Sequence, residues 1–162
     1  MGGYLNRRFS YPLFMNILKK WFSTSIQKIG FEDIKYAICH KEYLLINTMD
    51  SQSQGCLIYG TISMGEEETL INKLIEDSLC GSAKIIIYGR NSADSSADRK
   101  AEQLGSLGFR EVYIYSGGLF EWLLLQDIYG SSEFPTIGKC RDPLNYRGSP
   151  IFGSKRGLLE FF

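Results

Sequence analysis

Residues 84–118 read KIIIYGRNSADSSADRKAEQLGSLGFREVYIYSGG and carry the strongest signals for the fold. The run Lys84–Tyr88 contains three successive isoleucines and is apolar on both faces, which is typical of a central strand in a parallel sheet. A helix is expected over Ala97–Leu107, and Gly108 suits its C-terminal cap. Val112–Tyr115 is a second apolar strand, and a glycine turn follows it. This order of strand, helix and strand predicts an α/β fold with a mostly parallel sheet.

The remaining segments extend the same alternation in both directions. A chain of 162 residues, 44% of them hydrophobic, suits one domain with a core of its own. Two further helices of charged and apolar residues are expected at Phe31–Ile38 and Glu66–Leu79. Two short apolar runs lie at Tyr43–Thr48 and Leu57–Tyr59, and a strongly apolar helix is expected at Leu119–Ile128. Met49–Gly55 is expected to be a polar loop. Prolines 135 and 143 predict an irregular segment after the last helix.

The net charge is zero, but the charges are unevenly distributed along the chain. Residues 1–31 hold five basic residues and no acidic one, residues 32–138 hold eight basic and sixteen acidic ones, and residues 139–162 hold five basic and two acidic ones. The chain is therefore an acidic body with two basic ends. Such asymmetry points to interaction surfaces.

The N-terminal arm, residues 1–28, is aromatic as well as basic. Its segment Leu13–Phe22 places apolar side chains at helical spacing, with lysines beside them. Such a segment suits docking on a partner protein, lying on a membrane surface, serving as a mitochondrial presequence, or packing on its own domain. We favour docking. The partner-binding residues predicted here are Arg7, Arg8, Phe9, Phe14, Lys19, Lys20, Trp21 and Phe22.

The C-terminal tail, residues 131–162, mixes basic and aromatic residues without regular spacing. Nucleic acid is a poor fit because no RNA-binding motif is present and the positive charge is modest. An extended segment that packs into grooves of neighbouring proteins, or onto its own acidic body, fits better. The partner-binding residues predicted here are Arg141, Arg147, Lys155 and Arg156.

Several motifs in the body, taken together, resemble the rhodanese-like domain family over about residues 29–130. Tyr43–Asp50 resembles the family's strand that ends in an Asp-Val-Arg type motif, and Gly55–Gly60 resembles its Gly-His-Ile-Pro-Gly-Ala signature. Lys84–Tyr88 resembles the strand before the active-site loop. The Gly-Phe, Gly-Gly and Trp elements of the family's ending are matched, in order, by Gly108-Phe109, Gly117-Gly118 and Trp122. The resemblance implies a parallel five-stranded sheet with helices on both faces.

The departures from the family pattern bear on activity. In the sulfurtransferases of the family a cysteine directly follows the apolar strand and forms a persulfide, and here that position is Gly89. The related phosphatases also need an arginine six residues later, where this chain has Ser95. Cys56 stands at the signature's histidine and Asn47 stands near a common aspartate. The resemblance thus implies a degenerate active site without a catalytic residue.

The degenerate loop comprises Gly89, Arg90, Asn91, Ser92, Ala93, Asp94, Ser95 and Ser96. Its polar residues are expected to cap the following helix rather than to act as nucleophiles, since no histidine lies near in sequence to activate a serine. The alternative is an anion-binding site, because backbone amides at a helix start favour anions and Arg90 would assist. Asp94 and Asp98 oppose that alternative.

These observations predict a catalytically inactive rhodanese-like domain that serves as a structural or interaction subunit of a larger protein assembly. The resemblance suggests two settings, a ciliary microtubule-associated assembly and a mitochondrial complex. The alternatives are a sulfurtransferase-related or anion-binding regulator, and a peripheral membrane protein held by the N-terminal arm. No cofactor, metal, nucleic acid or obligatory small-molecule substrate is expected. Four scattered cysteines are expected to be reduced thiols in an intracellular, non-secreted protein.

Overall fold

The structure is a computed structural model that describes residues 26–151. The N-terminal partner-binding residues predicted above, and also Lys155 and Arg156, lie outside the described residues. The elements in chain order are β1 (Gln27–Ile29), α2 (Phe31–Cys39), β2 (Tyr43–Asn47), η1 (Ser51–Ser53), β3 (Cys56–Ile58), α3 (Met64–Glu76), β4 (Lys84–Tyr88), α4 (Ser96–Ser106), β5 (Glu111–Tyr115), α5 (Gly118–Tyr129), β6 (Thr136–Gly138) and η2 (Pro143–Tyr146).

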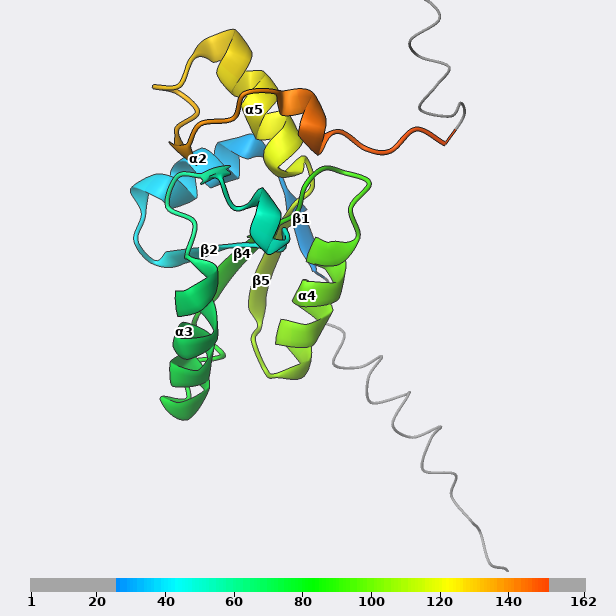
Figure 1. The fold of residues 1–162 in the computed structure, drawn as a ribbon. Helices are drawn as coiled ribbons and strands as arrows, with labels where there is room; N and C mark the ends of the chain where they lie inside the picture. Colours follow the sequence, from blue (N-terminus) through cyan, green and yellow to red (C-terminus); the bar gives the residue numbers. More distant parts are fainter. Residues whose placement is uncertain (1–25, 152–162) are drawn as a thin grey trace, which may run out of the picture.

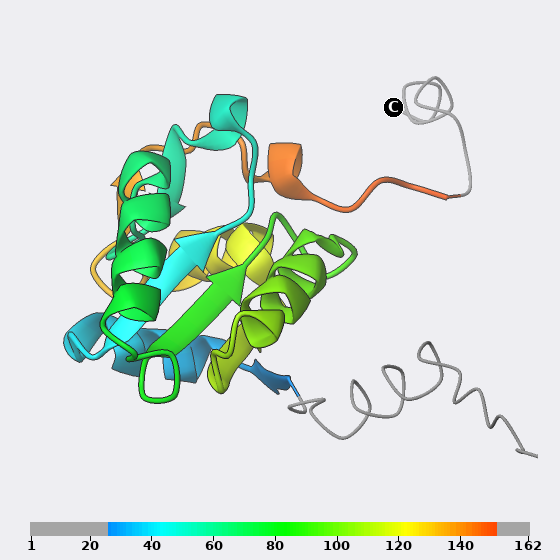
Figure 2. The same ribbon diagram turned by 90° about the horizontal axis from the view of Figure 1, so that it is seen from below.

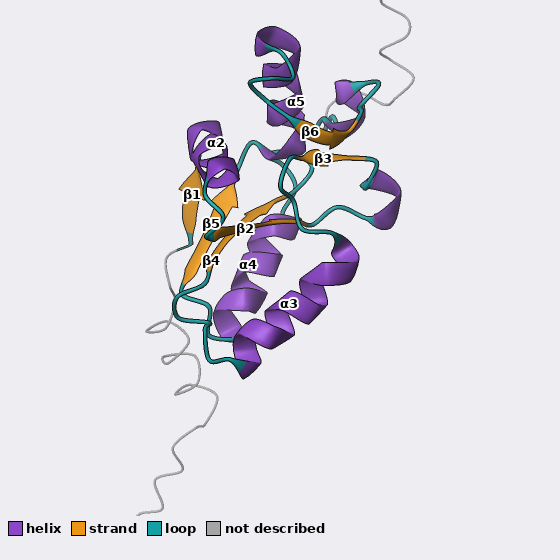
Figure 3. Ribbon diagram, turned by 90° about the vertical axis from the view of Figure 1, so that its left-hand side faces the viewer, coloured by secondary structure: helices purple, strands orange, loops and turns teal. Residues whose placement is uncertain are grey.

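A parallel sheet of four strands, in the order β1-β5-β4-β2, forms the middle layer (Figure 1). Helices α3 and α4 cover one face, and they flank the arrows of β2 and β4 in Figure 2. Helices α2 and α5 lie on the other side of the sheet (Figure 3). This is the α/β fold with a mostly parallel sheet that the sequence predicts.

The alternation of side chains along β4 divides the core into two halves. Ile85 and Ile87 pack with α3 and α4, whereas Ile86 and Tyr88 pack with α2 and α5. All four side chains are at most 2% exposed, so this strand is buried on both faces as its sequence predicts. Trp122 of α5 is fully buried and anchors the second half.

All four helices of the described residues differ from the predicted boundaries: α2 ends one residue later, at Cys39, α5 extends one residue further at each end, to Gly118–Tyr129, and α3 and α4 differ as follows. The helix predicted at Glu66–Leu79 begins at Met64, because the backbone carbonyl of Ser63 accepts the first helical hydrogen bonds. It ends at Glu76 because Ser78 adopts a left-handed backbone conformation, with φ of 59°. The helix predicted at Ala97–Leu107 is shifted by one residue, to Ser96–Ser106.

The second apolar run forms a strand, but outside the main sheet. β3 pairs antiparallel with β6, so the described residues contain four parallel main-sheet strands rather than the five that the resemblance implied. Only an isolated parallel bridge, Leu45 with Thr61, continues the sheet beyond β2. β1 and β6 were both missed, because strands of three residues are too short to show an alternating pattern. β1 includes Gln27 and Lys28, which the predicted boundaries assign to the N-terminal arm.

Candidate functional site

The loop from Gly89 to Ser96 joins β4 to α4 and lies where the parallel strands end (Figure 1). In open α/β sheets, ligands bind outside the carboxyl ends of the strands, so this is the natural site of the fold. The structure places the loop where the sequence predicted it. What the loop can do depends on its backbone amides and on the side chains that face them.

Gly89, the first residue after β4, has a carboxylate next to it. A Cβ atom built on Gly89 would lie 2.7 Å from Oδ2 of Asp94 and 3.3 Å from Oγ of Ser96. Contacts of that length with a Cβ are too short for ordinary packing. The space into which a side chain at position 89 would project is therefore occupied by the Asp94 carboxylate.

The Asp94 carboxylate is held by backbone amides on both sides of the loop. The amide of Arg90 donates to Oδ2 at 3.0 Å, and the amide of Ser96 donates to Oδ1 at 2.9 Å. Burial alone would raise the pKa of this carboxyl group, but these hydrogen bonds outweigh burial and lower the pKa. Asp94 is thus an internal anion at the start of α4. The N-cap residue, Ser95, makes no side-chain cap bond, and Asp94 instead accepts from the first helical amide, that of Ser96.

The first amides of α5 are also satisfied by the loop. Leu119 and Phe120 donate to the carbonyl oxygens of Gly89 and Arg90, at 3.0 and 2.9 Å. This close approach requires Gly118, because a Cβ there would lie 2.7 Å from the Gly89 carbonyl oxygen, and its φ is 62°. The two α5 amides and the two loop carbonyl oxygens are thus hydrogen-bonded to one another.

The Arg90 side chain is directed toward neighbouring segments. Its guanidinium donates to Oγ of Ser53 at 2.6 Å and to the carbonyl oxygen of Asn145 at 3.3 Å. It also lies over the ring of Tyr146, 5.6 Å from the ring centre. Asp50 lies 3.9 Å from the same guanidinium. Arg90 therefore ties η1 and η2 to the loop, and its charge is already partly matched by a carboxylate.

Asn91 forms a second contact between the loop and η2. Its side-chain amide donates to the carbonyl oxygen of Tyr146 at 2.7 Å, and its Oδ1 accepts from the amide of Ala93 at 2.9 Å. Asn91 is only 9% exposed. The segment around η2 is thus packed against the loop, a contact that the sequence did not reveal because 55 residues separate the partners.

A comparison of the sequence with models of known protein families identifies the family of this chain. The model described as the rhodanese-like domain matches residues 32–125, which is more than half of the chain. The chain belongs to the rhodanese-like domain family. The match includes the whole loop from Gly89 to Ser96 and the helices on either side of it.

Solved structures with the same fold have low sequence identity to this rhodanese-like domain. A protein from Saccharomyces cerevisiae, Ygr203w, is described as a homolog of single-domain rhodanese and the Cdc25 phosphatase catalytic domain; it is 13% identical, with a TM-score of 0.57 over 75% of this chain and 93% of that one. A protein from Lactobacillus plantarum is 18% identical, with a TM-score of 0.51 over 78% and 98% of the two chains. At such identities the likeness establishes the fold alone. A search of curated proteins found no match.

The serines of this rhodanese-like domain's loop differ in their surroundings. Ser92 and Ser95 are exposed, and Oγ of Ser95 accepts from Arg99 at 2.7 Å. The Ser96 hydroxyl lies 2.6 Å from that of Thr48. The only histidine of the chain, His40, precedes the amino end of β2, whereas the loop follows the carboxyl end of β4. Five residues of parallel strand separate the two ends, about 15 Å, so no imidazole activates these serines.

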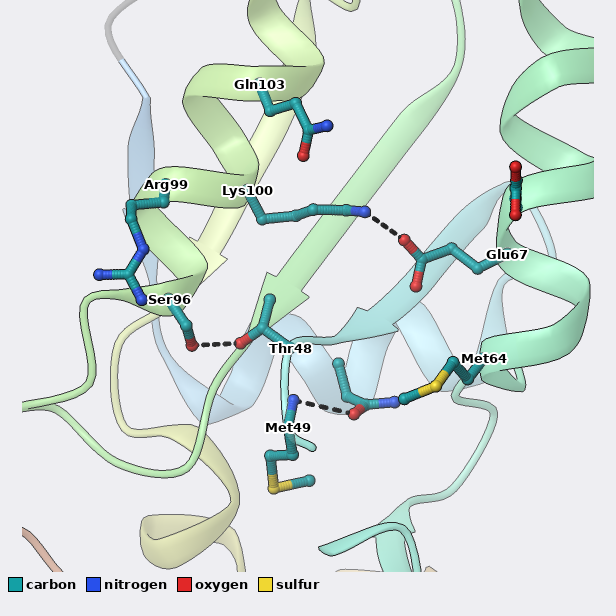
Figure 4. Close-up of a pocket in the computed structure, with 10 residues that line it drawn as sticks. Thr48, Met49, Met64, Glu67, Ser96, Arg99, Lys100 and Gln103 are labelled. Carbon is teal, nitrogen blue, oxygen red and sulfur yellow. Dashed lines mark hydrogen bonds and ion pairs between the residues drawn. The ribbon is translucent and has the colours of Figure 1, made fainter. Parts of the chain in front are cut away.

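A groove of about 430 Å³ lies between α3 and α4, and Ser96 of the loop is one of the residues that line it (Figure 4). Lys100 of α4 crosses it to Glu67 of α3, with 2.5 Å between Nζ and Oε1. Arg99 and Glu68 also line it, so both signs of charge are present. This mixture provides no field that selects an anion.

Two further observations concern binding groups. Within residues 26–151, no cluster of three or more histidine, cysteine, aspartate or glutamate side chains could hold a metal ion. Among the helices of the same residues, none is long and apolar enough to cross a membrane. Of the predicted partner-binding residues, Arg141 and Arg147 are described, and both are exposed on the segment around η2.

Proposed function

We propose that this rhodanese-like domain is catalytically inactive and serves as an interaction subunit of a larger protein assembly. The observation that carries the proposal is Gly89, which directly follows β4 and has the Asp94 carboxylate in the space of its missing side chain. By the resemblance, this is the position of the family's persulfide-forming cysteine. A residue without a side chain offers no nucleophile.

No other group of the loop takes over the nucleophile's role. The hydroxyls of Ser92, Ser95 and Ser96 have no histidine beside them. An unactivated hydroxyl is a weak nucleophile, because its pKa is far above neutral pH. The hydrogen bonds of Asp94 and of the Gly89 and Arg90 carbonyl oxygens instead hold the loop, α4 and α5 together. An interaction domain requires only this structural role of the loop.

The geometry favours this function over an anion-binding regulator. The amides of Arg90 and Ser96 already bind an anion, the carboxylate of Asp94. Arg90 is turned toward Ser53 and Asn145. An incoming sulfur or phosphate anion would have to displace a carboxylate that belongs to the chain itself. If the Asp94 carboxylate stayed in place, its negative charge would repel the incoming anion.

The exposed surface supports a protein partner. Leu124 and Ile128 lie four residues apart on α5 and are 39% and 71% exposed, and Tyr129 beside them is 62% exposed. Apolar side chains at this spacing share one side of a helix. Exposed apolar groups that lie together mark interaction sites. The basic residue Arg141 adds a group that suits an acidic protein surface.

The native size of the protein in a gentle lysate tests the proposal. We expect the tagged chain to elute far above its monomer mass of 18.4 kDa in gel filtration. Ile128→Glu should shift it toward the monomer, because a charge on the apolar stripe disfavours docking. Ile75→Glu on α3, at a side chain that is 38% exposed, is the matched control and should leave the elution unchanged. Elution of the unmodified chain as a monomer would overturn the proposal.

A further inference from the structure

Two of the four cysteines, distant in sequence, are brought together where β3 pairs with β6. Cys56 begins β3 and is paired across the antiparallel ladder with Gly138, the last residue of β6. The strands approach closely at that point: a Cβ on Gly138 would lie 2.1 Å from the carbonyl oxygen of Gly55 and 3.7 Å from Cα of Cys56. Cys140 follows only two residues later.

The two thiols share one environment. Cys56 is 2% exposed in the core on the α2 and α5 side of the sheet, and Cys140 is partly exposed and packs against that same core. Burial raises the pKa of both thiols, and the neighbouring Cys140 adds to the rise at Cys56. Cys140 is the accessible member of the pair, and Cys56 is the buried one.

The other two cysteines lie elsewhere. Cys39 ends α2 and is exposed, and Cys80 lies before the amino end of β4, where its carbonyl oxygen accepts from Arg110. Neither belongs to the β3–β6 ladder. They therefore serve as internal controls for thiol chemistry at Cys56 and Cys140.

We propose that Cys56 and Cys140 form a redox-active dithiol, which a low-molecular-weight disulfide such as oxidised glutathione converts into an intramolecular disulfide. The Cys140 thiolate attacks one sulfur of glutathione disulfide, and one glutathione thiolate leaves. The Cys56 thiolate then attacks the Cys140 sulfur of the mixed disulfide and releases the second glutathione. Two protein thiols are oxidised and one glutathione disulfide is reduced to two thiols.

The consequence concerns the segment that covers the loop. The chain continues from Cys140 to η2, whose Asn145 and Tyr146 carbonyl oxygens accept from Arg90 and Asn91. A bond between Cys140 and Cys56 fastens the start of this segment to β3. The disulfide thus fixes the cover of the degenerate loop, independently of whether the domain acts as an interaction subunit.

Peptide mapping of the full chain tests the proposal. The reduced protein is incubated with oxidised glutathione at increasing pH, remaining thiols are alkylated, and the digested chain is analysed by mass spectrometry. We expect a linked pair of peptides that contain Cys56 and Cys140, with Cys39 and Cys80 alkylated or singly glutathionylated. The yield at a fixed time should rise with pH, because exchange requires the thiolate.

Variants separate the two steps of the exchange. Cys140→Ser, at a partly exposed position, should abolish the linked peptides, and a Cys39→Ser/Cys80→Ser double variant should retain them. Cys56→Ser should accumulate a glutathione adduct on Cys140. Alkylation of both Cys56 and Cys140 after prolonged exposure to oxidised glutathione at alkaline pH would overturn the proposal. Linked peptides that instead contain Cys39 or Cys80 would overturn it too.

Discussion

Asp94→Ala removes the carboxylate that fills the loop from Gly89 to Ser96. The substitution deletes two charge-assisted hydrogen bonds, from the amides of Arg90 and Ser96. A hydrogen bond to a charged group contributes about 1.5–3 kcal/mol when buried, and loss of a helix cap costs about 1 kcal/mol in exposed settings. Asp94 is half-buried, so we expect a loss of about 2 kcal/mol in the free energy of unfolding.

The assay is urea unfolding followed by circular dichroism, at several pH values. In a parallel thermal unfolding experiment, the same loss of about 2 kcal/mol would lower the melting temperature by about 4–8 °C for a chain of this size. Because the folded-state pKa of Asp94 is lowered, its contribution is fully present above the ordinary aspartate pKa of about 3.9. The difference between variant and wild type should therefore stay constant from pH 7 to about pH 5 and shrink at lower pH.

Asp98→Ala is the matched control on the same helix. Asp98 forms an ion pair with Lys28 at 3.4 Å, and both side chains are largely exposed, at 45% and 63%. Such a pair contributes less than about 1 kcal/mol. If Asp94→Ala costs no more than Asp98→Ala, or if its cost does not shrink at low pH, the carboxylate does not hold the loop and the reasoning is refuted.

Three glycine substitutions test the packing around the loop and α4. Gly89→Cys should destabilise the fold by about 1–3 kcal/mol in urea unfolding, because its Cβ meets the Asp94 carboxylate, and adding Asp94→Ala should remove part of that cost. Gly118→Ala should lower the melting temperature, since φ is 62° and the Gly89 carbonyl oxygen is 2.7 Å from the new Cβ; an unchanged melting temperature would contradict this. Gly105→Ala, inside α4 with no atom within 4 Å of the new Cβ, should stabilise by about 0.5–1 kcal/mol in the same assay.

The sequence predicts the scaffold well because local patterns determine it. Three successive isoleucines between polar segments are typical of a strand buried on both faces, and β4 is that strand. The glycine turn before Trp122 places α5 as expected. The end of α3 differs from the predicted one because the backbone conformation of a single residue, Ser78, ends the helix. A φ value at one serine leaves no trace in hydrophobic periodicity.

The interior of the site was only partly predictable. That Asp94 binds an amide at the start of α4 follows from its position before the helix. That its carboxylate occupies the space of a side chain on Gly89 depends on the turn of the loop, which the sequence does not show. The contacts of Arg90 and Asn91 with η2 join residues 55 apart, and pairing of β3 with β6 brings Cys56 near Cys140. Such contacts arise from tertiary packing, which no local pattern encodes.

Catalytic sulfur transfer tests the central claim most directly. Thiocyanate formation from thiosulfate and cyanide is measured for the purified chain and for a variant with all four cysteines changed to serine. The account predicts no turnover by either protein above the rate in buffer, because Gly89 supplies no nucleophile and Asp94 occupies the loop. Multiple turnovers by the wild-type chain, whether or not the cysteine-free variant loses them, would contradict it.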